Sequence, residues 1–182
     1  MIGKAAVGRP IVLGLGGNLG NRLETLQSAV DALVDTPAVR IDAVSPVYET
    51  APFGGPAGQD GSRDLSDQPP FLNVVLIGST ELSPGTLLQR ALAIEQALGR
   101  RREEHWAART VDVDVIAYGE LVQDGPELIL PHPRAHQRAF VLVPWRDLDP
   151  QARLPGRGMI ADLLAELSLD GVQRRDDLHL QL

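Results

Sequence analysis

A β-strand that carries two aspartates is evident in Thr110-Val111-Asp112-Val113-Asp114-Val115-Ile116-Ala117, where β-branched residues alternate with the acidic ones. Residues two apart on a strand point to the same face, so we expect Asp112 and Asp114 to direct their carboxylates to one place. Carboxylate oxygens gathered in this way can bind one or two Mg²⁺ ions. The segment before the strand includes Gly-Arg-Arg-Arg at 99–102, whose guanidinium groups suit phosphate oxygens. The stretch suggests metal-assisted phosphoryl chemistry, although an isolated Asp-x-Asp pair is more often part of a solvated face.

The elements around this strand predict the fold. Apolar or alternating patterns predict further strands at 11–16, 39–48 and 71–80, with helices after the first and the third. The resulting order is strand, helix, strand, strand, helix, strand, which is typical of ferredoxin-like α+β sandwiches. We therefore expect a central, mainly antiparallel sheet with helices packed on it. Further along, a short helix is expected at 140–148 and an amphipathic helix at 160–167.

The two early helices show signals at their starts and along one side. Asn21 and Glu24 resemble a capping pair for the first helix, and Ser83-Pro84 is a typical start for the second. Pro46, near the end of the second strand, indicates an edge or a bend there. The first helix has an apolar stripe formed by Leu23, Leu26, Val30, Leu33 and Val34.

The composition excludes several classes of protein. The 182 residues suit a single domain, and 24 acidic against 17 basic residues give a net charge of −7, so we expect no nucleic-acid partner. The chain has no cysteine, which excludes disulfides and thiolate metal sites and fits a reducing compartment. No long apolar run suggests a membrane span, and the first ten residues lack the apolar core of a signal peptide. We expect a cytoplasmic monomer with no membrane partner.

A glycine-rich segment, Gly14-Leu15-Gly16-Gly17-Asn18-Leu19-Gly20, joins the first strand to the first helix. A dinucleotide-binding fingerprint needs a third glycine at position 19, which is Leu19, and a Walker A loop needs a lysine that this segment lacks. We therefore interpret the segment as a tight turn in which the glycines provide unusual backbone angles.

Aromatic and polar side chains recur together outside the acidic strand. Phe71 and Asn73 lie two apart at the start of the third strand and should face the same way. A ring beside a carboxamide suits a flat heterocycle that needs stacking and paired hydrogen bonds, although the pair alone is also ordinary for a core. Arg138 and Phe140 repeat the combination of a cation and a ring. Trp106 lies in a polar segment, so it should pack either on the domain or on an adenine ring.

Several motifs occur in one order and at compatible spacing. They are LGGNLG at 15–20, SPVYETAPFG at 45–54, PFLN at 70–73, Glu95 before Gly99-Arg100, RTVDVD at 109–114, LPHP at 130–133 and RAF at 138–140. With these motifs the chain resembles the family of 6-hydroxymethyl-7,8-dihydropterin pyrophosphokinases. Such enzymes of folate biosynthesis move the pyrophosphoryl group of ATP onto the hydroxymethyl group of a pterin and release AMP. The resemblance covers residues 11–148, and a C-terminal helix and tail at 149–182 would complete a single domain of residues 1–182.

The resemblance also implies roles for individual residues. Asp112 and Asp114 would hold two Mg²⁺ ions that bridge the ATP phosphates, with Arg100 and Arg109 as further catalytic residues. The remaining ATP contacts would come from Glu95, Arg102, Trp106, His132 and Arg138. The dihydropterin would be bound by Thr50, Pro52, Phe53, Phe71, Asn73 and Phe140, with its ring stacked between the phenylalanines at 71 and 140.

Two segments, Gly54–Pro70 and Gly99–Arg109, are expected to close over the substrates and exclude water. The chain departs from the family at Glu103, where a basic residue is familiar, and at Pro133, where an aromatic residue is familiar. The first departure removes one possible phosphate contact, for which Arg101 could compensate.

Two other interpretations fit the same residues. A nucleotidyltransferase of the polymerase-palm type also carries paired aspartates on a ferredoxin-like sheet and uses Mg²⁺, but it would release pyrophosphate instead of AMP. A non-catalytic ferredoxin-like binding module would leave Asp112 and Asp114 merely solvated, would need no metal and would tolerate Asp112→Ala. With two tryptophans, two tyrosines and three phenylalanines, the chain offers few stacking platforms for an RNA-binding sheet.

Overall fold

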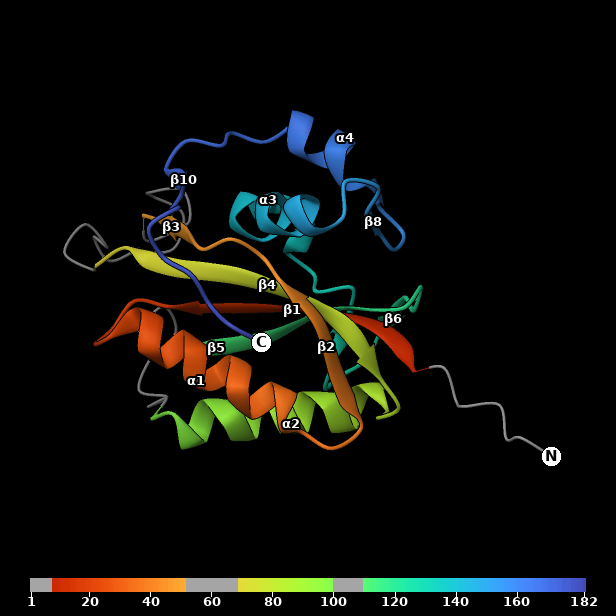
Figure 1. Ribbon diagram of the computed structural model, residues 1–182. Coiled ribbons are helices and arrows are strands. Elements are labelled where there is room, and N and C mark those ends of the chain that lie inside the picture. The colour runs from red at the N-terminus through yellow and green to blue at the C-terminus, as the bar shows by residue number, and fades with distance from the viewer. Residues whose placement is uncertain (1–7, 52–68, 100–109) are drawn as a thin grey trace.

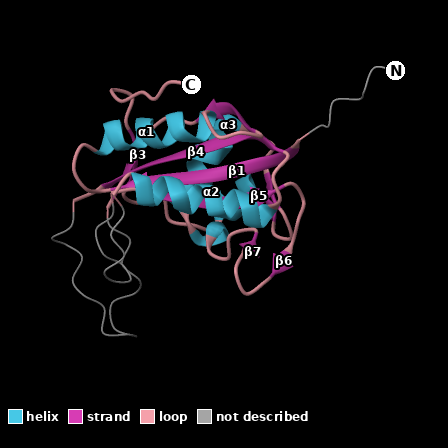
Figure 2. Ribbon diagram, turned by 90° about the horizontal axis from the view of Figure 1, so that it is seen from below, coloured by secondary structure: helices cyan, strands magenta, loops and turns pink. Residues whose placement is uncertain are grey.

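One sheet forms the middle layer of the molecule, between two pairs of helices (Figure 1). The computed structural model describes residues 8–51, 69–99 and 110–182. In chain order the elements are β1 (Arg9–Gly17), α1 (Arg22–Val34), β2 (Val39–Val44), β3 (Tyr48–Thr50), β4 (Phe71–Thr80), α2 (Pro84–Ala97), β5 (Asp112–Tyr118), β6 (Gln123–Asp124), β7 (Ile129–Leu130), the 3₁₀ turn η1 (Ala135–Gln137), α3 (Ala139–Leu148), β8 (Arg153–Leu154), β9 (Gly158–Met159), α4 (Ile160–Ala165) and β10 (Val172–Arg174). Helices α1 and α2 cover one face of the sheet (Figures 1 and 2), and α3 and α4 cover the other (Figure 1).

Every strand pair of the central sheet is antiparallel in the part of the chain that the structure describes. The strand order is β10-β3-β4-β1-β5, and β2 pairs with the half of β4 that β3 does not cover. Helix α1 connects β1 to β2 across β4, and α2 connects β4 to β5 across β1. This is the split arrangement of ferredoxin-like sandwiches. The predicted α+β fold with an antiparallel central sheet is therefore confirmed.

The strand that the sequence predicts at 39–48 is divided into β2 and β3. Pro46 has no N–H to donate, so the ladder is interrupted next to it. Ser45 bridges the interruption, because its backbone N–H donates to the Val75 carbonyl at 2.9 Å and its hydroxyl accepts from the Val75 N–H at 2.9 Å. The hydroxyl thus satisfies a backbone donor that the broken ladder would leave unpaired.

Alternation along the strands divides the buried side chains into two clusters. On the side of α1 and α2, Leu13 of β1 packs with Val113 of β5 and with the apolar stripe of α1. On the side of α3 and α4, Val75 of β4 and Ile116 of β5 pack against Leu142 of α3. Because neighbours on a strand point to opposite faces, the two aspartates that flank Val113 lie on the α3 side.

The helix starts agree with the sequence signals. The Asn21 side chain accepts from the Glu24 N–H at 3.4 Å and donates to the Glu24 carboxylate at 2.7 Å. The Ser83 hydroxyl accepts from the Thr86 N–H at 3.3 Å, with Pro84 as the first helical residue. The prediction of the apolar stripe on α1 was wrong at its last position, because Val34 is 43% exposed at the helix end. Ala29 completes the buried face of the helix instead.

The C-terminal segment crosses the edge of the sheet, which the sequence did not predict. Strand β10 pairs with β3, and the chain then runs past the sheet edge toward α1 (Figure 1). There Leu178 and Leu180 pack against the first cluster, and Gln181 exchanges two hydrogen bonds of 2.9 Å with Gln27. Helix α4 ends at Ala165, two residues before the predicted end. No helix in the described ranges is long and apolar enough to span a bilayer.

A buried tyrosine joins the sheet to α3. The hydroxyl of Tyr48, on β3, donates to Asp147 Oδ2 at 2.6 Å, and Arg174 of β10 lies 3.4 Å from the same oxygen. Burial and the adjacent carboxylate raise the pKa of Tyr48 to about 12, because both disfavour the phenolate. The protonated hydroxyl therefore contributes to stability over the neutral range.

We expect Tyr48→Phe to lower the free energy of unfolding by about 1–2 kcal/mol at pH 8, since it removes one hydrogen bond to a charged acceptor. The folded pKa of Tyr48 lies above its ordinary value, so this contribution is full below pH 10 and is lost as the pH rises toward 12. Urea unfolding at pH 8 and pH 11 measures both effects. If the wild type and the variant lose the same free energy of unfolding between pH 8 and pH 11, the hydrogen bond of Tyr48 does not account for the effect.

Candidate active site

The acidic strand is placed as the sequence predicts. Asp112 and Asp114 lie on β5, on the face opposite Val113. In the register with β1, Gly16 pairs with Asp112 and Gly14 pairs with Asp114. A glycine therefore stands at the directly opposed position beside each carboxylate, and no side chain of β1 competes for the space there.

The same row of the sheet brings an amide to the site. Asn73 of β4 pairs with Gly16 from the other side of β1, so Asn73 and Asp112 flank one glycine. A Cβ atom built at Gly16 would lie 2.7 Å from Asn73 Oδ1, which no real contact tolerates without displacement. The Asn73 amide donates to Thr50 Oγ1 at 2.8 Å, and both residues are buried. The carboxamide is thus held in place by its partner and by the bare backbone beside it.

This arrangement corrects our interpretation of the glycine-rich segment. Gly14, Gly16 and Gly17 belong to β1 and do not have positive φ angles, and only Gly20 of this segment has one, at 64°. A Cβ atom at Gly17 would lie 2.3 Å from the Thr110 carbonyl oxygen. The glycines in the strand serve close approach of neighbouring groups, and the turn geometry depends on Gly20.

Behind the acidic strand lies a buried carboxylate. Glu95 of α2 is 2% exposed, and its Oε1 accepts from the backbone N–H of Val113 at 2.8 Å. Glu95 reaches β5 from the α2 side, whereas the two aspartates point to the α3 side. It therefore fixes the backbone between Asp112 and Asp114, and its role as an ATP contact stays a prediction.

A histidine follows on the outer edge of β5. The backbone N–H of His132 donates to the Ile116 carbonyl at 2.8 Å, which places the turn after β7 beside β5. Burial lowers the pKa of His132, and Arg138 lowers it further, although Asp114 opposes both. Nδ1 accepts from the backbone N–H of Arg134 at 3.2 Å, so the neutral ring carries its proton on Nε2. His132 is thus a neutral donor at neutral pH.

Arg138 links this turn to the acidic strand. Its guanidinium lies 3.5 Å from Asp114 Oδ2 and 5.6 Å from the centre of the Phe140 ring. The side chain of Asp114 is 43% exposed, whereas that of Arg138 is 19% exposed. The structure therefore gathers Asp114, His132, Arg138 and Phe140 on one side of the sheet.

The start of β4 is held by two side chains that the sequence did not single out. Asn18 donates to the Pro69 carbonyl at 3.2 Å, and Arg22 donates to the Pro70 carbonyl at 2.6 Å. Phe71 comes next in the chain. Because these partners are about fifty residues apart, no local pattern could have indicated the contacts.

Other predicted site residues lie outside the described residues. They are Pro52, Phe53, Arg100, Arg102, Trp106 and Arg109. The expected lids, most of Gly54–Pro70 and Gly99–Arg109, and the departure at Glu103 also fall there.

The two aspartates fit a site for Mg²⁺. Within residues 8–51, 69–99 and 110–182, no group of three or more His, Cys, Asp or Glu side chains could hold a metal by itself. Mg²⁺ in enzymes that act on nucleotides is commonly bound by one or two carboxylates and by phosphates of the substrate. Asp112 and Asp114 suit such a site, in which a nucleotide supplies the remaining ligands.

Comparison with known proteins decides the family. The model of the 7,8-dihydro-6-hydroxymethylpterin-pyrophosphokinase family matches residues 12–150. The chain belongs to this family. Pyrophosphokinases named 2-amino-4-hydroxy-6-hydroxymethyldihydropteridine pyrophosphokinase are similar to it over most of their length. The Methylorubrum extorquens protein is 40% identical, and the match covers 89% of this chain and 96% of that protein. The Pseudomonas aeruginosa protein is also 40% identical, and the match covers 90% of this chain and 95% of that protein. The Mycobacterium leprae protein is 43% identical over 86% and 82%.

Solved pyrophosphokinase structures share the fold. A crystal structure of an HPPK-DHPS protein in complex with substrates has a TM-score of 0.65 and 12% identity, and covers 88% of this chain. Wild-type Plasmodium falciparum HPPK-DHPS with pteroate has a TM-score of 0.64 and 14% identity, and covers 87%. This chain spans 43% and 42% of those longer chains. At these identities the likeness shows the fold alone.

We expect Gly16→Ala to lower the free energy of unfolding by about 1–3 kcal/mol, because the added methyl displaces the Asn73 amide from Thr50 and leaves buried polar groups unpaired. Gly85→Ala is the matched control, since a Cβ atom there meets nothing within 4 Å. Gly85 lies in α2, so its replacement should stabilise by up to about 1 kcal/mol. Urea unfolding compares the two variants, and a neutral Gly16→Ala would contradict the close approach.

Proposed function

We propose that this member of the pyrophosphokinase family transfers the pyrophosphoryl group of ATP to the hydroxymethyl group of 6-hydroxymethyl-7,8-dihydropterin and releases AMP in folate biosynthesis. The observation that carries the proposal is the row of the sheet in which Asn73 and Asp112 flank Gly16. It places an amide suited to a heterocycle beside carboxylates suited to Mg²⁺. The names of the relatives, which are about 40% identical, support the same substrate.

The pterin side of the site comprises Phe71, Asn73 and Thr50 in our proposal, with Phe140 across from them. Phe71 and Asn73 are two apart on β4 and face the same way, and Thr50 holds the Asn73 amide. Stacking binds the flat ring, and a fixed amide discriminates its polar edge by paired hydrogen bonds. Pro52 and Phe53 are proposed as further pterin contacts from the sequence alone.

On the ATP side, we propose that Asp112 and Asp114 hold two Mg²⁺ ions. When bound, these ions neutralise phosphate charge and polarise the transferred group. Arg138 provides a permanent positive charge, and the Nε2–H of His132 can donate to a phosphate oxygen. Glu95, Arg100, Arg102, Trp106 and Arg109 are proposed as further ATP contacts, and Glu95 also holds the β5 backbone at Val113.

The transfer requires little covalent chemistry from the protein. The hydroxymethyl oxygen forms a bond to the β-phosphorus of ATP, the bond from that phosphorus to the α-β bridging oxygen breaks, and AMP leaves with those electrons. The hydroxyl proton is released in the same process. Positioning of the two substrates and stabilisation of the charge that develops on phosphate oxygens therefore account for catalysis.

We also propose that residues 1–182 form one domain that acts as a monomer in the cytoplasm. Pairing of β10 with β3 supports the single domain, because it builds the C-terminal tail into the same sheet as the site. Size-exclusion chromatography with light scattering tests the monomer.

The direct test mixes the protein with ATP, Mg²⁺ and 6-hydroxymethyl-7,8-dihydropterin and quantifies products by chromatography. We expect AMP and pterin pyrophosphate in equal amounts, and neither with a chelator. Release of inorganic pyrophosphate would favour the nucleotidyltransferase, and folded protein without Mg²⁺-dependent products would favour the binding module.

Asp112→Asn and Asp114→Asn should each lower turnover at least about a hundredfold without unfolding the protein, because each removes a charged metal ligand.

Phe71→Ala should mainly weaken binding of the pterin. We expect the KM for the pterin to rise about tenfold or more, with the KM for ATP little changed, because one face of the stacking site is removed. Steady-state kinetics with each substrate varied in turn measures the effect. An unchanged pterin KM would place the ring elsewhere.

A further inference from the structure

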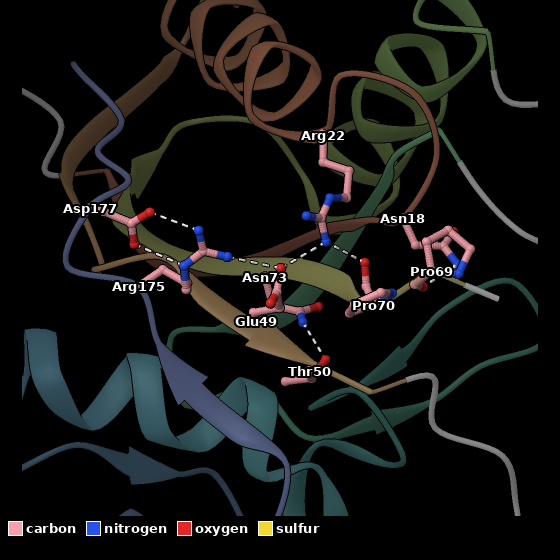
Figure 3. Close-up of polar contacts among 9 residues, drawn as sticks. All are labelled: Asn18, Arg22, Glu49, Thr50, Pro69, Pro70, Asn73, Arg175 and Asp177. Atoms are coloured by element: carbon pink, nitrogen blue, oxygen red, sulfur yellow. Dashed lines mark hydrogen bonds and ion pairs between the residues drawn. The ribbon is translucent and has the colours of Figure 1, made fainter. Parts of the chain in front are cut away.

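An ionic cluster lies beside the ends of β3 and β4 that carry the proposed pterin residues (Figure 3). Glu49 Oε2 is 2.9 Å from Arg22 Nη1 and 3.1 Å from Arg175 Nη1. The three side chains are 22%, 26% and 30% exposed, so the cluster is largely shielded from solvent. Both carboxylate oxygens of Asp177 accept hydrogen bonds from the Arg175 guanidinium, at 2.8 and 2.7 Å. This contact lowers the pKa of Asp177 to about 2.

The cluster is attached to both strands that carry the proposed pterin residues. Glu49 lies on β3 immediately before Thr50, and Arg22 donates to the carbonyl of Pro70 immediately before Phe71. Glu49 pairs in register with Leu72, whose side chain belongs to the α1 cluster. The charged side chains of the cluster therefore lie on the face of the sheet opposite the proposed pterin site. They act on that site through the backbone of β3 and β4.

Arg175 reaches this cluster from the C-terminal tail. Its backbone N–H donates to the Val47 carbonyl at 2.9 Å, which continues the pairing of β10 with β3. The preceding residue, Arg174, points to the other face and lies 3.4 Å from Asp147 of α3. Residue 175 is beyond the residues 12–150 that the family model matches, so this contact is not part of the motif set described above.

We propose that Arg175 is a positioning residue for the pterin site, which through Glu49 holds the ends of β3 and β4 that present Thr50, Phe71 and Asn73. The inference rests on the proposed function. Without Arg175, Arg22 is the remaining cationic partner of Glu49 in this cluster. Because the same Nη1 of Arg22 contacts both Glu49 and the Pro70 carbonyl, a stronger pull toward Glu49 weakens its hydrogen bond to Pro70. Asp112 and Asp114 lie on β5, two strands from β4, so the ATP side is unaffected.

Arg175→Met tests the proposal, because it removes the charge and keeps the backbone pairing with Val47. We expect the KM for the pterin to rise about five- to tenfold while kcat and the KM for ATP stay within about twofold, as a positioning role for one substrate requires. Arg175→Lys should give an intermediate pterin KM, since an ammonium can pair with Glu49 as a point charge but cannot reproduce the fork with Asp177.

Arg174→Met is the matched control. It changes the adjacent arginine, the last residue of β10, but leaves the Glu49 contact in place, so the pterin KM should stay within about twofold of the wild-type value. A double-mutant cycle with Glu49→Gln adds a second measurement. If Arg175 acts through Glu49, the double variant should be no worse than the more impaired single variant, whereas independent effects would multiply.

The result that would overturn the proposal is a pterin KM within about twofold of wild type in folded Arg175→Met, or an equal rise in Arg174→Met, which would indicate general docking of the tail. Thermal unfolding establishes the folded state, and Arg175→Lys with Glu49→Gln replaces the Met variant if the latter does not fold. Calorimetric titration of 6-hydroxymethylpterin gives the same comparison without turnover. Failure of the proposed function appears separately, as wild-type protein that makes no AMP.

Discussion

The close approach of the Asn73 carboxamide to the bare backbone of Gly16 joins the two halves of this site. On one side of the glycine stands an amide suited to a ring, and on the other stands a carboxylate suited to a cation. A side chain on β1 would fill the space between them. The central strand of the sheet must therefore supply hydrogen bonds to both neighbours while having nothing above its backbone at that point, and glycine alone does this.

The two faces of the sheet divide the physical tasks. The α1 and α2 face buries an apolar cluster that includes Val111, Val113 and Val115 of the acidic segment, so the strand that carries the metal ligands is also anchored in the core. Glu95 adds a buried carboxyl group on this side, where it accepts a hydrogen bond from one backbone N–H. Burial of a carboxyl group is costly unless it is hydrogen-bonded, and the N–H of Val113, between Asp112 and Asp114, provides Glu95 with such a partner.

Local pattern determined which parts of the molecule could be predicted. Strand β4 has an apolar run between turn residues, and its predicted bounds are those of the structure. The face shared by Asp112 and Asp114 follows from strand geometry alone. The role of Gly16 could not be predicted because it depends on Asn73, which is 57 positions away in the chain, and β10 forms only because β3 offers an edge. Glu95 was recognised as part of a motif, but its direction depends on how α2 packs.

The tail that covers β3 also sets an order for the folding of the chain during synthesis. Gln181 contacts Gln27 across 154 residues of sequence, and β10 pairs with a strand made more than a hundred residues earlier. A ribosome therefore finishes every other strand of the central sheet before β10 can dock. Until then β3 is an uncovered edge that can pair with another nascent chain, and the short length of β3, three residues, limits that hazard.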